Sequence, residues 1–434
     1  MIYTADYLLT QNATRDVIRS GALFVEKGRI ADIGSCADVI ARHPKAEVLN
    51  LGESVILPGL VNGHTHVAMS ALRGFSDDKA LMDWLQQDIF PVEARLTPEI
   101  VQTSAAFSCA ELIRTGCTAI FDMYMLEDSV FRAVTAAGIR GVLGENVTRF
   151  YPGLSAKTEE AHFDRIRRYA QEWKGNPLVT GAVTPHAIYT TTPELLERCR
   201  ALADETGFLF GLHLSETVGE TESCIFERVM RPVEYCRSLG LLREDTSLFH
   251  MVDVNEIDLS TVADCGCAIV HNPASNMKLA SGVAPLSKML ACGIPVSIGT
   301  DGPASNNAQN LFREMYLASL LQKVDKRDPL EMPAQTILDL ATRGGAAALH
   351  DPDIGSLEKG KKADFIALDL TTPNLQPVHN IVSNLVYAAT GLENRLTVVE
   401  GRILYQDGRF TTLDYPELCH EMHAIHDWAH RQNG

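Results

Sequence analysis

Between Pro58 and about residue 350, short apolar runs typical of strands alternate with stretches that have the apolar spacing of helices. This alternation indicates a parallel sheet whose strands are joined by crossover helices. Clear helices are predicted at 98–115, 193–206 and 285–292. Eight candidate strands fall at 55–65, 117–123, 141–147, 178–186, 208–215, 247–252, 268–271 and 295–301.

Eight strand-helix units suffice to close a barrel. The predicted fold class is therefore α/β, with a (β/α)8 TIM-like barrel over residues 58–352. An open doubly wound sheet is the alternative. It does not explain why polar side chains collect where successive strands end, whereas those ends form the rim on which barrel enzymes build their active sites.

The two ends of the chain have a different texture, with short β-rich runs separated by glycine turns. ALFVEKGRIADIG indicates a hairpin that turns at Gly28. ADFIALDL at 363–370 and LTVVEGRILYQDGRF at 396–410 repeat the pattern near the other end. We therefore expect residues 1–57 and 353–434 to pack together as one small β-sandwich domain with a C-terminal helical tail.

Charge and cysteine usage exclude several classes of protein. With 38 Lys and Arg against 55 Asp and Glu, the formal net charge is -17. This charge repels phosphate backbones and anionic lipids, so neither a nucleic-acid nor a membrane partner is expected. MIYTADYLLT lacks the pattern of a signal peptide and no apolar run approaches a membrane span, which predicts a cytoplasmic protein. The 10 cysteines are scattered, and we expect them to be reduced.

Histidines and one aspartate stand at the ends of several predicted strands. His64 and His66 end the first strand and, being two residues apart, point to the same face. His213 ends the fifth strand in GLHLSE, and Asp301 ends the eighth in SIGTDG. Three neutral imidazoles and one carboxylate suit one divalent metal ion, Zn²⁺ or Fe²⁺, with an open position for water. These four residues are the predicted metal ligands.

Further polar residues lie beside this set. His250 ends the sixth strand in LFHMVD, and His271 ends the seventh in VHNPASN. Glu216 stands three residues beyond His213, just past the strand end, where it reaches a substrate without being a ligand. Because a metal lowers the pKa of a bound water from about 15.7 to about 7, such a site favours hydrolysis. Glu216 is then the natural proton carrier.

The motifs PGLVNGHTH, HLSE, VHNPASNMKL and GTDGPASNN resemble those of the amidohydrolase superfamily. With FPVEARL and TPHAIY added, the set is similar to the 5-methylthioadenosine/S-adenosylhomocysteine deaminases, from about Ile2 to Gly408. The resemblance implies that a metal-activated water removes ammonia from an adenosine-type nucleoside. The alternatives are another enzyme of this superfamily, acting on aminofutalosine, guanine or a triazine ring, and a non-catalytic scaffold.

The resemblance also implies a role for each site residue. The four predicted ligands would hold one catalytic metal, zinc before iron. Glu216 would move protons, and His250 or Asp301 would accept the proton of the water. Glu93 in FPVEARL would accept hydrogen bonds from the ribose hydroxyls, and His186 in TPHAIY would touch the nucleoside. Glu216 and Asp301 would also face the substrate, and further pocket residues would be Trp84 and Ser305.

The chain departs from the pattern of the family at two places. VTGAVTPHAIYT has no lysine, whereas binuclear members carry a carboxylated lysine at the end of the fourth strand, so one metal is favoured. GENVTRF places Glu145 where relatives often carry arginine, with Arg149 as the candidate substitute. A neutral tail such as methylthio is therefore expected rather than a homocysteine carboxylate. A homo-oligomer is expected because such barrels commonly form one.

Two charged groups are interpreted as solvated. His423, His426 and His430 would share one face of a terminal helix, and chain ends usually expose such faces. The cationic cluster RIRR at 165–168 is expected on the exposed side of a barrel helix.

Overall fold

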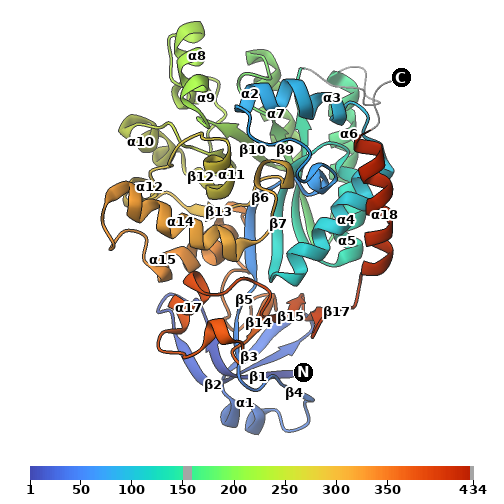
Figure 1. Cartoon of the computed structure of the whole chain (residues 1–434), viewed down its shortest axis with the longest axis vertical. Helices are drawn as coiled ribbons and strands as arrows, with labels where there is room; N and C mark the ends of the chain where they lie inside the picture. The colour runs from blue at the N-terminus through green and yellow to red at the C-terminus, as the bar shows by residue number, and fades with distance from the viewer. Residues whose placement is uncertain (150–158, 431–434) are drawn as a thin grey trace.

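The middle of the chain forms a closed parallel barrel (Figure 1) in the computed structural model, which describes residues 1–149 and 159–430. Consecutive strands are neighbours from β6 to β13. The ring closes because the backbone N–H groups of Thr300 and Asp301 donate to His64 O at 3.1 and 3.0 Å. The predicted barrel is confirmed. Its strands in the described ranges are β6 (Leu60–Thr65), β7 (Cys117–Tyr124), β8 (Arg140–Val147), β9 (Val179–Pro185), β10 (Leu209–Leu214), β11 (Thr246–His250), β12 (Ala268–His271) and β13 (Val296–Ile298).

Apolar side chains fill the interior of the barrel. Phe121 on β7 and Phe249 on β11 meet edge to face with their ring centroids 5.3 Å apart, a favoured aromatic geometry. Gly211 on β10 leaves room for them, since a Cβ there would lie 2.9 Å from the Phe249 ring. The interior is thus a packed core, and the polar chemistry is left to the rim.

Helices surround the barrel (Figure 1), and those at 98–115, 193–206 and 285–292 match the prediction closely. The first two begin at Pro98 and Pro193, each after a threonine whose side chain caps the helix. No helix in the described part of the chain is long and apolar enough to cross a membrane. The helices and helical turns, in chain order, are α1 (Cys36–Arg42), η1 (Val67–Leu72), α2 (Leu81–Trp84), η2 (Leu85–Ile89), α3 (Phe90–Glu93), α4 (Pro98–Arg114), α5 (Glu127–Ala137), α6 (Glu159–Glu172), α7 (Pro193–Thr206), α8 (Val218–Arg228), α9 (Pro232–Ser238), α10 (Glu256–Cys265), α11 (Pro273–Lys278), α12 (Leu286–Ala291), α13 (Pro303–Asn306), α14 (Leu311–Lys326), α15 (Ala334–Asp339), η3 (Leu340–Gly344), α16 (Gly345–Ala348), η4 (Pro373–Leu375), α17 (Ile381–Tyr387) and α18 (Tyr415–Ala429).

Strands from both ends of the chain form a second, mixed sheet at the foot of the barrel (Figure 1). The strand β5 pairs in parallel with β1 and antiparallel with β14, which joins the two ends. Tyr3 on β1 and Phe365 on β14 pack with their ring centroids 4.8 Å apart in the core of this sheet. The strands are β1 (Ile2–Leu9), β2 (Val17–Glu26), β3 (Arg29–Ser35), β4 (Val48–Asn50), β5 (Ser54–Pro58), β14 (Phe365–Asp369), β15 (Asn394–Val399), β16 (Arg402–Gln406) and β17 (Arg409–Phe410).

The predicted first barrel strand, 55–65, is wrong as a single strand. The structure divides it into β5 of the mixed sheet and β6 of the barrel. The division falls at Gly59, where a Cβ would lie 2.0 Å from Thr118 Oγ1, so the chain passes close to β7 as it changes sheets. The apolar run conceals this break because both halves are buried.

The C-terminal helix α18 packs along α4 and η1 on the outside of the barrel (Figure 1). Arg95 donates to Trp428 O at 3.2 Å and to Ala429 O at 3.0 Å, at the end of this helix. The helical tail, which we grouped with the β domain, therefore lies against the barrel. Residues 431–434 of the tail are outside the described residues.

A buried ion pair connects the barrel to the mixed sheet. Arg140, the first residue of β8, contacts Asp364 at 2.8 and 3.2 Å and Glu400 at 3.0 Å. Arg140 and Asp364 are both buried, and Asp364 directly precedes β14. A buried charge that loses its partner destabilises a fold strongly.

Replacing Arg140 by alanine should therefore lower the free energy of unfolding by about 3–5 kcal/mol, because Asp364 would stay buried without its partner. Urea denaturation followed by circular dichroism measures the loss. The matched control is Arg167→Ala, since Arg167 pairs with Glu205 near the surface and its loss should cost less than about 1 kcal/mol. Equal losses in the two variants would contradict the role of the buried pair.

Candidate active site

The four predicted ligands converge at one point of the barrel rim. His64 Nε2 lies 3.2 Å from His213 Nε2 and 3.5 Å from Asp301 Oδ1. His66 Nε2 lies 3.1 Å from the same carboxylate oxygen. His250 also reaches this point, since one donor atom each of His64, His213, His250 and Asp301 lies within 4.8 Å of the others. All five side chains are buried.

The outer ring nitrogens determine where the lone pairs point. His213 Nδ1 lies 2.8 Å from His186 O, and His66 Nδ1 is hydrogen-bonded to Met123 O. A backbone carbonyl only accepts, so each Nδ1 carries the proton. In the neutral rings, both Nε2 atoms then turn a lone pair inward. Lone pairs that face one another and a carboxylate fit a divalent cation.

Burial and the Asp301 carboxylate set the charge of this cluster. Burial lowers the pKa of His64 to about 3 and the pKa of His213 well below its usual value. Burial would also lower the pKa of His66, but the hydrogen bond and charge of Asp301 outweigh it and raise that pKa. Although burial would raise the pKa of Asp301, its hydrogen bonds with His64 and His66 hold it well below the usual range. The cluster therefore presents the uncharged rings of His64 and His213 together with the charged Asp301 carboxylate.

Polar residues after β12 and β13 hold the cluster in place. Ser275 Oγ and Ser305 Oγ donate to Asp301 Oδ2 at 2.6 and 2.8 Å. Asn276 Oδ1 lies 2.8 Å from His250 Nδ1. Ser305 is among the predicted pocket residues, whereas Ser275 and Asn276 are not among the predicted site residues. The signal was present, because both stand in VHNPASN directly after the strand.

Glu216 follows β10 and lines the same cavity as His213, His250 and Asp301. Its backbone N–H donates to Glu220 Oε2 at 2.8 Å, which holds the turn after the strand. Glu216 Oε1 lies 3.8 Å from His250 Nδ1. Burial raises the pKa of Glu216, and the charge of His250 opposes this. A carboxyl group with a raised pKa takes up and releases a proton closer to neutral pH.

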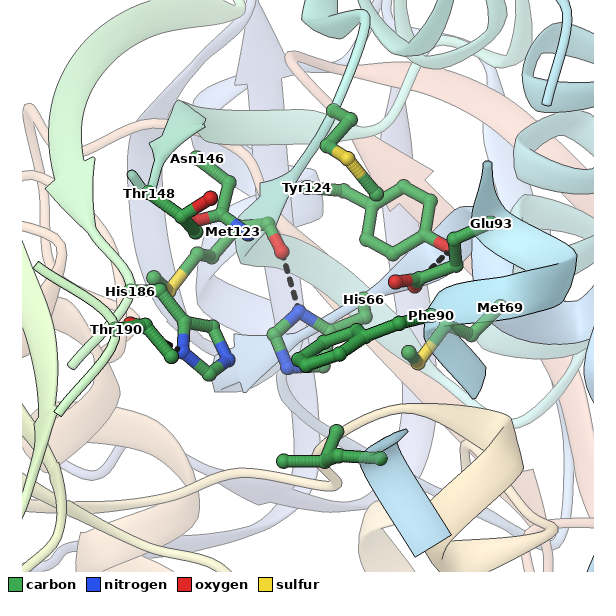
Figure 2. Close-up of a pocket in the computed structure, with 12 residues that line it drawn as sticks. His66, Met69, Phe90, Glu93, Met123, Tyr124, Asn146, Thr148, His186 and Thr190 are labelled. Atoms are coloured by element: carbon green, nitrogen blue, oxygen red, sulfur yellow. Dashed lines mark hydrogen bonds between the residues drawn. The ribbon is translucent and has the colours of Figure 1, made fainter. Parts of the chain in front are cut away.

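Two adjoining cavities open from this centre. The first is lined by Glu216, His213 and His250. The second is lined by Glu93 (Figure 2). The two cavities share the lining residues His66, Met69, Leu85 and His186. The predicted pocket residues Trp84, Glu93, His186 and Ser305 all line this space. The lining residues that the sequence analysis missed include Phe90, Tyr124, Asn146, Thr148 and Thr190.

Glu93 ends α3, and its side chain turns toward Tyr124 (Figure 2). It is only 4% exposed, although FPVEARL by itself indicates a solvated carboxylate. Tyr124 Oη donates to Glu93 Oε1 at 2.6 Å. Burial raises the pKa of Glu93 to about 7, against the effect of this hydrogen bond. Near neutral pH the carboxyl group is thus poised between its two charge states.

His186 lies on the other side of the second cavity (Figure 2). Its Nδ1 is 3.0 Å from Thr190 Oγ1. Burial lowers the pKa of His186 to about 3, so the ring is neutral. A neutral imidazole held at Nδ1 presents Nε2 for a hydrogen bond to a bound molecule.

Glu145 has a structural partner and does not line either cavity. The N–H of Glu127 donates to its carboxylate at 2.9 Å, and Arg165 Nη1 lies 3.1 Å from it. Arg165 is therefore largely covered, and the predicted exposed position is wrong for this residue. Arg167 and Arg168 pair with surface glutamates instead. The next residue after Glu145, Asn146, lines the second cavity, and Arg149 is exposed.

The remaining histidines lie outside the cluster. His271 is fully buried at the end of β12, and burial lowers its pKa to about 3. His423, His426 and His430 are exposed on α18 or at its end, as predicted.

The residues 55–404 match the model of the amidohydrolase family. The chain is 50% identical over 429 residues to the 5-methylthioadenosine/S-adenosylhomocysteine deaminase of Nitratidesulfovibrio vulgaris (strain Miyazaki F). The matched region covers 99% of this chain and 97% of that protein. The chain is 46% identical over 428 residues to the protein of the same name from Lawsonia intracellularis, with coverage of 99% and 97%. Among solved structures, an adenosine deaminase from Xanthomonas campestris with bound zinc has a TM-score of 0.95 at 32% identity, with coverage of 99% and 98%. The chain therefore belongs to the amidohydrolase family, in the group of the 5-methylthioadenosine/S-adenosylhomocysteine deaminases.

The donor geometry predicts that His213→Ala weakens metal binding. Loss of an outer partner of a ligand already costs about 10- to 100-fold in affinity, and loss of an inward nitrogen should cost more. The metal content after zinc loading and gel filtration, measured by plasma mass spectrometry, tests this. His426→Ala, on the exposed face of α18, is the control and should keep the wild-type content. A His213→Ala variant that retains as much zinc as the control would show that the cluster is not the metal site.

Proposed function

We propose that this chain is a hydrolytic deaminase of adenosine-type nucleosides, with 5-methylthioadenosine preferred and S-adenosylhomocysteine as the second candidate substrate. The adjoining pair of cavities carries this proposal, because one contains Glu216 beside the histidine and aspartate cluster and the other contains Glu93. A 6-aminopurine in the first cavity would have its ribose in the second. The names of the relatives from Nitratidesulfovibrio vulgaris and Lawsonia intracellularis support the same substrates.

The donor set supports one divalent metal, held by His64, His66, His213 and Asp301. Zinc is our first choice and iron the alternative, because imidazole and carboxylate ligands suit both. When bound, the metal would lower the pKa of a water from about 15.7 to about 7 and supply hydroxide near neutral pH. The zinc named for the Xanthomonas campestris structure supports this choice. The strand β9 carries no lysine, which supports one metal rather than two.

The residues beside the metal position would move the protons of the reaction. Water adds to C6 of the purine, and His250 or Asp301 accepts the proton that it loses. Glu216 gives a proton to ring N1, which makes C6 a better electrophile. The amino group takes up the proton that the water lost and leaves as ammonia, and the added hydroxyl returns a proton to Glu216, so that one water is consumed and the 6-amino group becomes a 6-oxo group. Positioned proton transfer of this kind contributes about 10²- to 10⁴-fold in rate.

The second cavity would hold the sugar and its 5′ substituent. Glu93 would accept hydrogen bonds from the ribose hydroxyls, and His186 would contact the nucleoside. Phe90 and Met125 line the same cavity as Thr148. Apolar and thioether side chains suit a methylthio group better than a charged homocysteine tail. A cytoplasmic location and a homo-oligomeric assembly stay predictions from the sequence.

Replacing Glu216 by glutamine should lower kcat by about 10²- to 10⁴-fold, because the amide neither takes up nor delivers the proton for N1. Ammonia release from 5-methylthioadenosine measures the rate. Bound metal should stay at the wild-type level, since Glu216 is not a proposed ligand. Turnover close to wild type with a normal metal content would disprove the proton-transfer role.

The proposal itself is tested by ammonia release from 5-methylthioadenosine, S-adenosylhomocysteine, adenosine, aminofutalosine, guanine and an aminotriazine. We expect the highest kcat/KM for 5-methylthioadenosine, with S-adenosylhomocysteine lower because its tail is charged. The Glu216→Gln protein, purified in parallel, accounts for contaminating deaminases. A preference for guanine or the triazine would replace the nucleoside proposal by the alternative hydrolase function.

A further inference from the structure

Tyr124 and Glu93 form a buried pair at the wall of the second cavity (Figure 2). The two side chains are 3% and 4% exposed, and their hydrogen bond is 2.6 Å long. Within the described residues, Tyr124 is the one side chain that hydrogen-bonds to the Glu93 carboxylate. The pair is 31 residues apart in sequence, so it joins two separate segments of the rim.

Tyr124 and Glu93 belong to different kinds of secondary structure. Tyr124 is the last residue of β7, and its backbone N–H donates to Glu127 Oε1 at 2.8 Å. Glu93 stands on the short helix α3, which follows the π-helical turn η2 and the short helix α2. The barrel strand is the firmer element because it is hydrogen-bonded along both sides. Tyr124 thus fixes a carboxylate on a short helix relative to the barrel.

The chemistry of the two side chains determines which one donates in this hydrogen bond. A carboxylate only accepts, so the tyrosine hydroxyl must donate and occupies one lone pair of Oε1. Glu93 and Tyr124 both line the second cavity, and the other lone pairs of the carboxylate are left without a side-chain donor among the described residues. A carboxylate fixed at one oxygen is suited to bind two neighbouring hydroxyl groups, since its orientation is set before they arrive.

We propose that Tyr124 is a positioning residue that orients Glu93 for the 2′,3′-diol of the nucleoside, so that the preference for ribose over dideoxyribose depends on the Tyr124 hydroxyl. This inference rests on the proposed function. It adds a residue outside the predicted site, and it assigns that residue to sugar selectivity rather than to the deamination step.

The test is the substitution Tyr124→Phe, which keeps the ring in the cavity wall and removes the hydroxyl. We expect kcat/KM for adenosine to fall by about 10- to 100-fold, as for loss of a hydrogen bond to a charged group, mainly through KM. The kcat/KM for 2′,3′-dideoxyadenosine should change by less than about threefold, because this substrate has no 2′ or 3′ hydroxyl for Glu93 to bind. In a Glu93→Ala background, Tyr124→Phe should have no further effect on the ratio of the two substrates, since the two residues act through one contact.

The matched control is Tyr169→Phe. Tyr169 is also a buried tyrosine whose hydroxyl contacts carboxylates, at 3.2 Å from Asp128 and 3.4 Å from Glu145, but it does not line either cavity. It should leave the ratio of ribose to dideoxyribose substrate unchanged. The proposal is overturned if the Tyr124→Phe enzyme keeps the wild-type ratio of the two kcat/KM values, whether or not both values fall.

A binding measurement separates this inference from the proposed function. Calorimetric titration with inosine and 2′,3′-dideoxyinosine compares wild type and Tyr124→Phe without requiring turnover. A wild-type chain that deaminates no nucleoside, yet binds inosine better than dideoxyinosine through Tyr124, refutes the proposed function and keeps the positioning role. Equal binding of the two ligands by the wild type refutes the positioning role, whatever the enzyme turns over.

Discussion

The inward lone pairs of the rim histidines are the constraint on which the surrounding structure depends. His66 Nε2 faces the Asp301 carboxylate and His213 Nε2 faces His64 Nε2, so a proton or a cation between these atoms makes their approach favourable. Both rings keep this orientation because two backbone carbonyls hold their Nδ1 atoms. Two serine hydroxyls hold Asp301 in the same way. The outer contacts therefore stabilise a geometry that the inner atoms alone would not adopt.

The end of β7 connects this centre to the second cavity through three consecutive residues. Asp122 Oδ1 accepts a hydrogen bond from the backbone N–H of Val67 at 2.6 Å. Val67 directly follows His66 in the chain. Met123 O holds the ring of His66, and Tyr124 Oη binds Glu93. The Asp122 side chain, the Met123 carbonyl and the Tyr124 side chain thus contact three different neighbours. One strand end thus connects the histidine and aspartate cluster to Glu93 in the second cavity.

Local patterns predicted the parts of the structure that local chemistry determines. The alternation of strands and helices indicated the barrel, and the two-residue spacing of His64 and His66 indicated a shared ligand face. The change of sheet at Gly59 was not predictable, because Thr118 lies far along the chain. For the same reason, residue spacing predicts neither the burial of Glu93 nor the cover over Arg165. Their burial comes from tertiary contacts that no residue spacing reveals.

Under the proposed function, the groups that react and the groups that select the substrate stand on different kinds of element. The histidines, Asp301 and Glu216 stand at or just beyond barrel strands, where backbone pairing fixes them. Trp84, Phe90 and Glu93 stand on the short helices between β6 and α4, which are not part of a hydrogen-bonded sheet. We expect a substitution among these helices to change the shape of the two cavities without moving the cluster of ring nitrogens. Tyr124 is where the two sets meet, because a strand residue there determines the position of a helix residue. Changes of substrate should therefore arise in the helical segment, and changes of reaction at the strand ends.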